Sequence, residues 1–295
     1  MKIIYLLLLS AICTVSTFAQ ISGNQAYSRN KYERSINKNN FDLTNSITST
    51  DSTLVINVDI LLNQRADLYK LVLGLNQEGQ SPKECISKIN SRIEEFKSQI
   101  AKLGIKKEDV FVDFISLNRI YDFEVTRDNA KEVAMGFEIK KNIIIKIASF
   151  DAIEKVMVEA ANSEIYDIIK VDYLNKDIEK IHQQLLDEAF LILERKKNDY
   201  LQKCNRKIIG NPRATDNFSF SSPAGQYENY SAYQGSEVTS YSSSFTKKLA
   251  RKNETFYYQG LPYSGYDKVI NNESPEVGIQ YILNLSVTFD IAKNK

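Results

Sequence analysis

The chain of 295 residues is 43% hydrophobic and 25% charged, with 38 basic and 37 acidic side chains. This composition is typical of a globular protein that is long enough to bury one large core or two smaller ones. Because the opposite charges nearly cancel, the sequence lacks the basic excess of a nucleic acid binding protein. Nucleic acid is therefore not an expected partner.

The first 19 residues have the features of a secretory signal peptide. Met1 and Lys2 give a short positive start, residues 3–9 are apolar, and Thr17-Phe18-Ala19 offers a small-residue cleavage site. Polar residues interrupt the apolar run, which is therefore short for a membrane span. We expect a mature chain from Gln20 onward that has no transmembrane span and is exported, either to the periplasm or to the outer membrane. Residues 20–53 are rich in Asn, Ser and Thr and are predicted to form a flexible arm.

The clearest local pattern is two strands followed by a helix, over residues 54–104. Apolar residues alternate over 54–60 and are dense over 68–75, as in half-buried or buried strands. Ser81-Pro82-Lys83-Glu84 is a capping box with proline at the first helical position, and Gly104 ends the helix. Residues at alternating steps of three and four predict one apolar stripe: Ile86, Ile89, Ile93, Phe96, Ile100 and Leu103.

The same order of elements then occurs again. Strands are predicted over 109–123 and 136–148, and a second helix from Asp151 with Glu154 in the capping-box position. A strand over 165–174 and a helix over 177–204 follow. Residues 279–291 alternate with a period of two and predict a last strand that pairs with an early one. We therefore expect an α+β fold, in the order ββα-ββα-βα-β, with helices packed on a mostly antiparallel sheet.

Residues 205–276 differ in composition from the rest, because tyrosines stand among many Ser, Asn and Gly residues. This length exceeds a simple connection, and tyrosine offers a large contact area with a polar tip. We predict an insertion whose hairpins lie on the core, and two further uses stay open: stacking on carbohydrate, or docking and assembly with a protein. The candidate interaction surface comprises Tyr227, Tyr230, Tyr233, Tyr257, Tyr258, Tyr263 and Tyr266.

The sequence predicts no catalytic, metal-binding or cofactor-binding residues. His182 is the only histidine, too few for a zinc site of His and Cys ligands, and we expect it to flank the core of its helix. After removal of residues 1–19, Cys85 and Cys204 remain, and whether they form a disulfide is open. A hydrolase stays as an alternative, because carboxylates from distant segments can meet in a fold.

Several local phrases resemble the SIMPL domain family of exported bacterial proteins. They are Ala66-Asp67-Leu68, residues 74–79, Leu103-Gly104-Ile105, Asp109-Val110, Gly136-Phe137-Glu138 and Lys170-Val171-Asp172-Tyr173. The family often has Pro-Asp where this chain has Ala66-Asp67. The resemblance covers a domain of residues 54–204 plus 277–292, and residues 205–276 have no matched counterpart. It implies a periplasmic or outer-membrane-associated α+β protein that is prone to oligomerise, with no established catalytic residues and, in some relatives, a link to stress tolerance.

Together these observations predict a non-catalytic exported envelope protein that acts through oligomerisation or binding, with a role in envelope or oxidative stress tolerance. The expected partner is a second copy of the chain, with another envelope protein or a carbohydrate as further partners. The alternative is a periplasmic or surface protein that binds carbohydrate or a small ligand through the tyrosine-rich segment. No cofactor is expected.

Overall fold

The computed structural model describes residues 25–26, 47–125, 130–241, 244–251 and 255–292. The predicted signal peptide and most of the predicted arm lie outside these ranges. The chain divides into two compact units, one of residues 38–226 with 260–295 and one of residues 1–37 with 227–259. Each unit is described below by itself.

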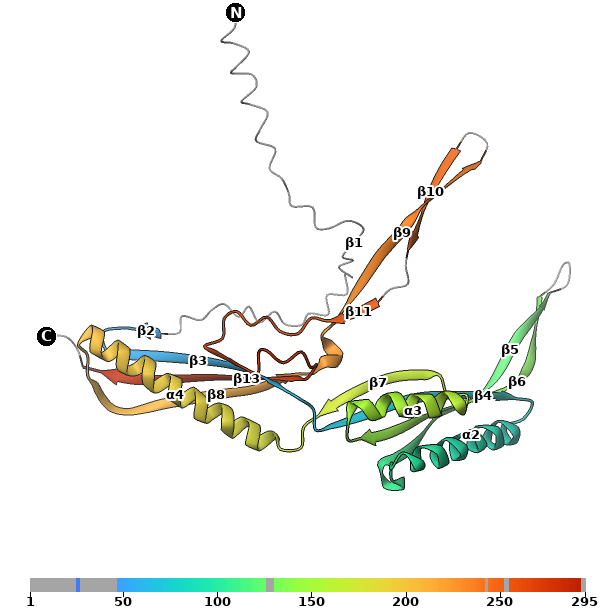
Figure 1. Ribbon diagram of the computed structural model, residues 1–295, viewed down its shortest axis with the longest axis horizontal. Coiled ribbons are helices and arrows are strands. Elements are labelled where there is room, and N and C mark those ends of the chain that lie inside the picture. The colour runs from blue at the N-terminus through green and yellow to red at the C-terminus, as the bar shows by residue number, and fades with distance from the viewer. Residues whose placement is uncertain (1–24, 27–46, 126–129, 242–243, 252–254, 293–295) are drawn as a thin grey trace, which may run out of the picture. The chain divides into compact units, whose positions relative to one another are not determined.

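The larger unit contains a sheet that pairs early and late strands of the chain, in the strand order β12-β3-β13-β8, with β2 also paired to β3. The strands are β2 (Ile47–Ser49), β3 (Thr53–Gln64), β8 (Ile208–Ser221), β12 (Lys268–Ile270) and β13 (Ile279–Ile291). β13 runs antiparallel to β3 along twelve residue pairs, which confirms that the last strand pairs with an early one. The helix α4 (Ile178–Cys204) lies along this sheet (Figure 1).

The core of this sheet forms because every second residue of β3 faces α4. Leu54, Ile56, Val58 and Ile60 are fully buried against α4 residues such as Leu185. The opposite face of β3 and β13 carries mostly polar residues, with Leu61 and Ile282 as buried exceptions, so the period of two largely separates core from surface. Ion pairs also stabilise this sheet. Lys196 of α4 pairs with Asp267 just before β12, and Arg213 of β8 pairs with Asp290 of β13.

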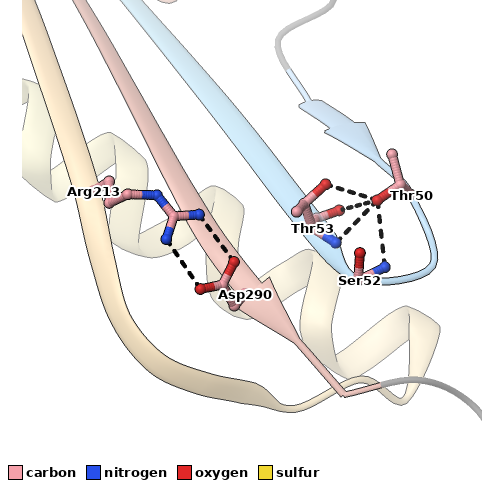
Figure 2. A network of polar contacts seen from close by, with 5 residues as sticks. All are labelled: Thr50, Ser52, Thr53, Arg213 and Asp290. Carbon is pink, nitrogen blue, oxygen red and sulfur yellow. Dashed lines mark hydrogen bonds and ion pairs between the residues drawn. The ribbon is translucent and has the colours of Figure 1, made fainter.

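One end of the sheet is held by two groups of polar contacts, which Figure 2 shows. Arg213 of β8 and Asp290 of β13 form a two-pronged ion pair, with nitrogen-to-oxygen distances of 3.1 and 2.9 Å. The hydrogen bond from Arg213 lowers the pKa of the Asp290 carboxyl. In the turn before β3, the Thr50 hydroxyl accepts the backbone N–H groups of Ser52 and Thr53 at 3.3 and 3.0 Å.

Residues 205–276 contribute β8 to this sheet, where it pairs along the length of β13.

The same unit contains a second sheet, in the order β5-β6-β4-β7. Its strands are β4 (Leu68–Gly79), β5 (Val110–Val125), β6 (Ala130–Ile147) and β7 (Asp167–Leu174), with the short 3-10 turn η1 (Lys107–Asp109) before β5. The helices α2 (Pro82–Lys102) and α3 (Phe150–Asn162) share one core with the buried face of β4 and β6 (Figure 1). All strand pairs in this sheet are antiparallel.

The start of α2 follows the sequence prediction closely. The Ser81 hydroxyl accepts the backbone N–H of Glu84 at 3.3 Å, while the Glu84 carboxylate accepts the N–H of Gln80 at 2.9 Å. The predicted apolar stripe is wrong at both ends, because Ile86 and Leu103 are each 39% exposed. Cys85 is fully buried in place of Ile86, since it stands four residues before Ile89 and so lies over the same face.

The start of α3 differs from the prediction. The helix begins at Phe150, one residue earlier than expected, with Ser149 at the N-cap and no side-chain capping bond. Asp151 therefore lies within the first turn, where its charge complements the helix dipole. The predicted α+β class, the order of elements from β3 to α4 and the mostly antiparallel pairing are confirmed. Among the described strands, the one parallel pair joins β12 to β3.

The smaller unit is an antiparallel sheet built around β9 (Tyr227–Tyr241). β10 (Ser244–Arg251) pairs with the C-terminal part of β9, and β11 (Thr255–Tyr258) pairs with its N-terminal part. β1 (Gln25–Ala26) pairs with β9 at Ala232 and Ser231.

Candidate functional site

β5 is the edge of its sheet and runs for 16 residues. One side pairs with β6 from Val110 to Val125, whereas the other side pairs with no strand in the described ranges. The pairing of β4 with β6 ends at Gly79 and Phe137, so residues 130–136 of β6 pair with β5 alone. Beyond that point β5 and β6 form a projecting two-stranded ribbon (Figure 1), which we name the β5-β6 ribbon.

A close approach of two backbones marks where the ribbon leaves the sheet. Gly136 has a φ of +152°, and a Cβ atom there would lie 2.6 Å from the carbonyl oxygen of Gly79. No larger residue fits at that distance without moving the backbone of β4. The register of β5 shifts between Ile120 and Tyr121, directly opposite this glycine. The bulge bends the ribbon away from β4 at this point.

The edge strand β5 carries large apolar side chains that are exposed to solvent. Six of them are between 49% and 78% exposed: Phe111, Phe114, Ile115, Tyr121, Phe123 and Val125. Tyr121, Phe123 and Val125 alternate along the strand and therefore lie on one face of the ribbon. Isolated exposed apolar residues are ordinary, but a row of them on an unpaired strand is a template for pairing with another chain.

β5 lacks two of the features that usually prevent such pairing, although it carries acidic residues and a register shift between Phe114 and Ser116. It contains no lysine and no proline, the residues with which proteins commonly guard exposed edges. The Arg119 guanidinium lies 5.3 Å from the centre of the Phe137 ring on the neighbouring strand, so this cation is turned to its own sheet. The sequence pattern predicts a strand here, over residues 109–123, but not its exposure. The available signal was a long aromatic strand without lysine or proline.

The seven predicted interaction tyrosines fall into two groups, one in each unit. Tyr227, Tyr230, Tyr233, Tyr257 and Tyr258 belong to the β9 sheet, whereas Tyr263 and Tyr266 belong to the larger unit. Within the first group, Tyr227 and Tyr258 are cross-strand neighbours whose rings meet edge to face at 5.9 Å. Tyr257 is exposed, and the side chain of Tyr233 lies outside the described part of the structure.

The two tyrosines of the larger unit have polar surroundings. The Tyr263 hydroxyl accepts a hydrogen bond from the Asn63 amide at 3.0 Å, and its ring is exposed. Burial, and to a smaller extent the nearby Asp59, raises the pKa of Tyr266. Each group is thus a separate surface, and the role predicted for these tyrosines stays a prediction.

The fold and these surfaces can now be compared with known proteins. The family model named SIMPL, described as a protein of unknown function (DUF541), matches residues 62–252. The chain belongs to the SIMPL family. The match contains the whole of β4 to β8, with β5 and the ribbon, and continues into β10. It therefore includes residues 205–252, for which the local phrases gave no counterpart, but it does not reach residues 277–292, which the resemblance included. No curated protein matches the chain.

Two carboxylates of this SIMPL protein lie together beside β3, between the parts of β3 that pair with β2 and with β12. The Asp267 carboxylate accepts the backbone N–H of Asp59 at 3.0 Å and binds the Lys196 ammonium at 2.5 Å. The Asp59 carboxylate accepts the Asn284 amide at 2.6 Å. Lys196 also donates to the carbonyl of Asn57 at 2.9 Å. These contacts fasten α4 and the start of β12 to the strand edge, and the hydrolase alternative stays a prediction.

Replacing Asp59 with asparagine should raise the free energy of unfolding at pH 7. Burial raises the pKa of Asp59, with a further contribution from Asp267, against the opposing effects of Asn284 and Lys196. A carboxyl whose pKa is higher in the folded chain than in the unfolded chain destabilises the fold as the pH rises past its ordinary range. The gain should therefore shrink as the pH falls below that range. Urea unfolding between pH 3 and 7 measures it, with the exposed Asp51→Asn as the control; a gain that is equal at every pH would contradict it.

The histidine and the two cysteines named from the sequence lie in ordinary packing and surface positions. His182 contacts the Asp216 carboxylate at 2.9 Å and stacks on Phe218 with the ring centres 4.6 Å apart. Cys85 and Cys204 are both free thiols, the first buried and the second exposed, so they do not pair. Within the described ranges, no helix is long and apolar enough to cross a membrane.

Proposed function

We propose that this SIMPL protein is a non-catalytic, exported envelope protein that acts by assembling with copies of itself through the free edge of β5. The observation that carries the proposal is the 16-residue edge strand, which pairs on one side only and bears a row of exposed apolar side chains. Export rests on the signal-peptide pattern of residues 1–19, and the role in envelope or oxidative stress tolerance rests on the family resemblance.

A second copy suits this edge for a physical reason. An unpaired strand offers a row of N–H and C=O groups that only another unpaired strand can match along its length. Every copy of the chain presents β5 itself, so two copies can pair edge to edge about a two-fold axis. The pairing would cover apolar side chains on both strands, and it would add strands to a ribbon that is marginal when two-stranded.

Replacing Phe123 with lysine should reduce the mass of the protein in solution to that of a monomer. The side chain is 64% exposed, so the change leaves the core intact while placing a charge on the proposed contact. Light scattering after size exclusion measures the mass of residues 20–295. Val158→Lys is the matched control, because Val158 is 60% exposed but lies on α3. A monomeric parent chain, or equal loss of mass in both variants, would contradict the proposal.

A second variant tests the first tyrosine group as the contact. The Gln280 side-chain oxygen accepts hydrogen bonds from Gln226 at 2.8 Å and from the N–H of Leu261 at 2.6 Å. The two ends of segment 227–259 are therefore close, and a short Gly-Ser linker can replace it. We expect the oligomer to persist in this variant. Loss of the oligomer here, but not in Phe123→Lys, would assign assembly to the β9 sheet.

The alternative function, binding of carbohydrate or a small polar ligand, is favoured by one feature of the larger unit. A shallow depression of about 420 Å³ is lined by Asn63, Arg65, Asn271, Asn272, Glu273 and Ser274. Tyr263 is bonded to Asn63 and is exposed. Amide groups beside an exposed aromatic ring suit sugar hydroxyls and a sugar face. A glycan array probed with residues 20–295 tests it, and an array without any bound glycan would contradict it.

A further inference from the structure

A partly enclosed cavity of about 460 Å³ lies between the C-terminal half of α2, the turn before η1 and the first residue of β5. Its apolar lining includes Ile100, Ile105 and Val110. Ile100 belongs to the core of the second sheet, and the other two pack against that core while remaining partly exposed. The volume is within the range of small-molecule sites, which are mostly apolar with a few placed polar groups.

The rim of this cavity is strongly basic. Three lysines line it, Lys97, Lys106 and Lys107, against one carboxylate, Glu94. Lys97 is paired with Glu94 at 2.9 Å. Lys106 and Lys107 form no ion pair with any residue in the described ranges. Two ammonium groups at the mouth of an apolar cavity are thus available to an anion from outside the chain.

The electrostatics around the rim agree with this arrangement. The hydrogen bond from Lys97, with smaller help from Lys107, lowers the pKa of Glu94. Burial lowers the pKa of the Lys141 ammonium, and the like charge of Lys97 adds to that effect. Lys97 and Lys107 thus attract the one carboxylate of the rim, whereas Lys97 repels the nearby Lys141 of β6.

We propose that this cavity binds a single-chain amphipathic anion of the fatty-acid class, with the apolar chain against Ile100, Ile105 and Val110 and the carboxylate at Lys106 and Lys107. The charge complementarity of the rim selects an anion over a cation, and the apolar lining selects a chain over a bare ion. The site lies on α2 and η1, so the inference goes beyond assembly through β5 and does not depend on it.

Titration calorimetry of residues 20–295 with dodecanoate, below its micelle concentration, tests the proposal. We expect one site, roughly tenfold weaker binding of the matched cation dodecyltrimethylammonium, and no measurable binding of acetate. Absence of dodecanoate binding, or equal binding of the cation, would overturn the proposal. Binding of acetate with the same affinity would also overturn it, because the apolar lining would then contribute nothing.

Two variants locate the site. Lys106→Gln with Lys107→Gln should weaken dodecanoate binding about fivefold, whereas Lys155→Gln with Lys203→Gln removes equal charge elsewhere and should leave it unchanged. Ala101→Phe, an exposed position in the last turn of α2 that lines the cavity, should abolish binding by filling the space. Unchanged binding in both the double variant and Ala101→Phe would place the ligand elsewhere and overturn the assignment.

Discussion

Replacing Arg92 with methionine should lower the free energy of unfolding by about 3 kcal/mol, because four acceptors, two of them in part-buried contacts, lose one shared charged donor. Arg92 projects from α2 with its side chain 19% exposed. It donates to the Asn76 carbonyl at 2.9 Å and to the Gln77 side chain at 3.2 Å, both on β4. It also donates to the carbonyls of Ser163 and Glu164, at the end of α3.

These contacts make Arg92 a polar link between α2, β4 and the end of α3. The planar guanidinium reaches β4 and the end of α3 at once, in a fork that a lysine ammonium cannot reproduce. Glu164, which receives one of these bonds, adopts a left-handed backbone with a φ of +58° that an L residue seldom adopts without support. Arg92→Lys should therefore recover only part of the lost stability.

Urea unfolding of residues 20–295 measures the effect, with Lys88→Ala as the matched control. Lys88 stands four residues earlier on α2 and pairs with Glu84 at the surface, so its removal should change the free energy of unfolding far less. If Arg92→Met and Lys88→Ala have equal small effects, the guanidinium does not hold the sheet together and the interpretation is wrong.

The elements that the sequence predicts well are those whose signal is local, such as a cap or an alternation of apolar residues. The capping box at Ser81 joins residues three apart, and the alternation of β3 and β13 follows from one face of each strand being buried. Even there the predicted stripe of α2 is wrong at its first position, because Cys85 and Ile86 both fit the spacing. Only the packing of α2 on β4 and β6 decides which of the two is buried.

The candidate sites were harder to predict because they depend on topology. β5 is an edge because β4 lies between β6 and β7, and the order of strands along the chain does not reveal this arrangement. The tyrosines 227–266 are close in sequence but divide between two units, since the chain leaves and re-enters the larger unit at residues 226 and 260. Arg92 likewise meets Ser163 across 71 residues of sequence.

Replacing Gln280 with leucine should lower the local stability of the sheet around Gln280 by about 3 kcal/mol, because buried hydrogen-bonding groups lose their partner. Gln280 is 2% exposed although it lies on the polar face of β13. Its oxygen accepts from Gln226 at 2.8 Å and from the N–H of Leu261 at 2.6 Å. Its amide group donates to the Asn63 side chain at 2.8 Å.

The position of these bonds gives the substitution a second expected effect. Gln226 and Leu261 stand where the chain leaves and re-enters the larger unit, so Gln280 holds both connections to the β9 sheet. Loss of about 3 kcal/mol of local stability corresponds to amide exchange at Leu261 that is roughly a hundredfold faster. The exchange of residues in the core of α2 should change far less, because those residues belong to the other core of the unit.

The matched control is Thr288→Val, which removes a polar group from the same face of β13 while keeping the shape of the side chain. Hydrogen exchange read residue by residue separates the two effects, since a general loss of stability would accelerate exchange throughout the unit. If Leu261 exchanges at the parent rate in Gln280→Leu, Gln280 does not hold the connections. If its exchange accelerates while the rest of β13 stays protected, the two connections form a joint that opens independently of the sheet.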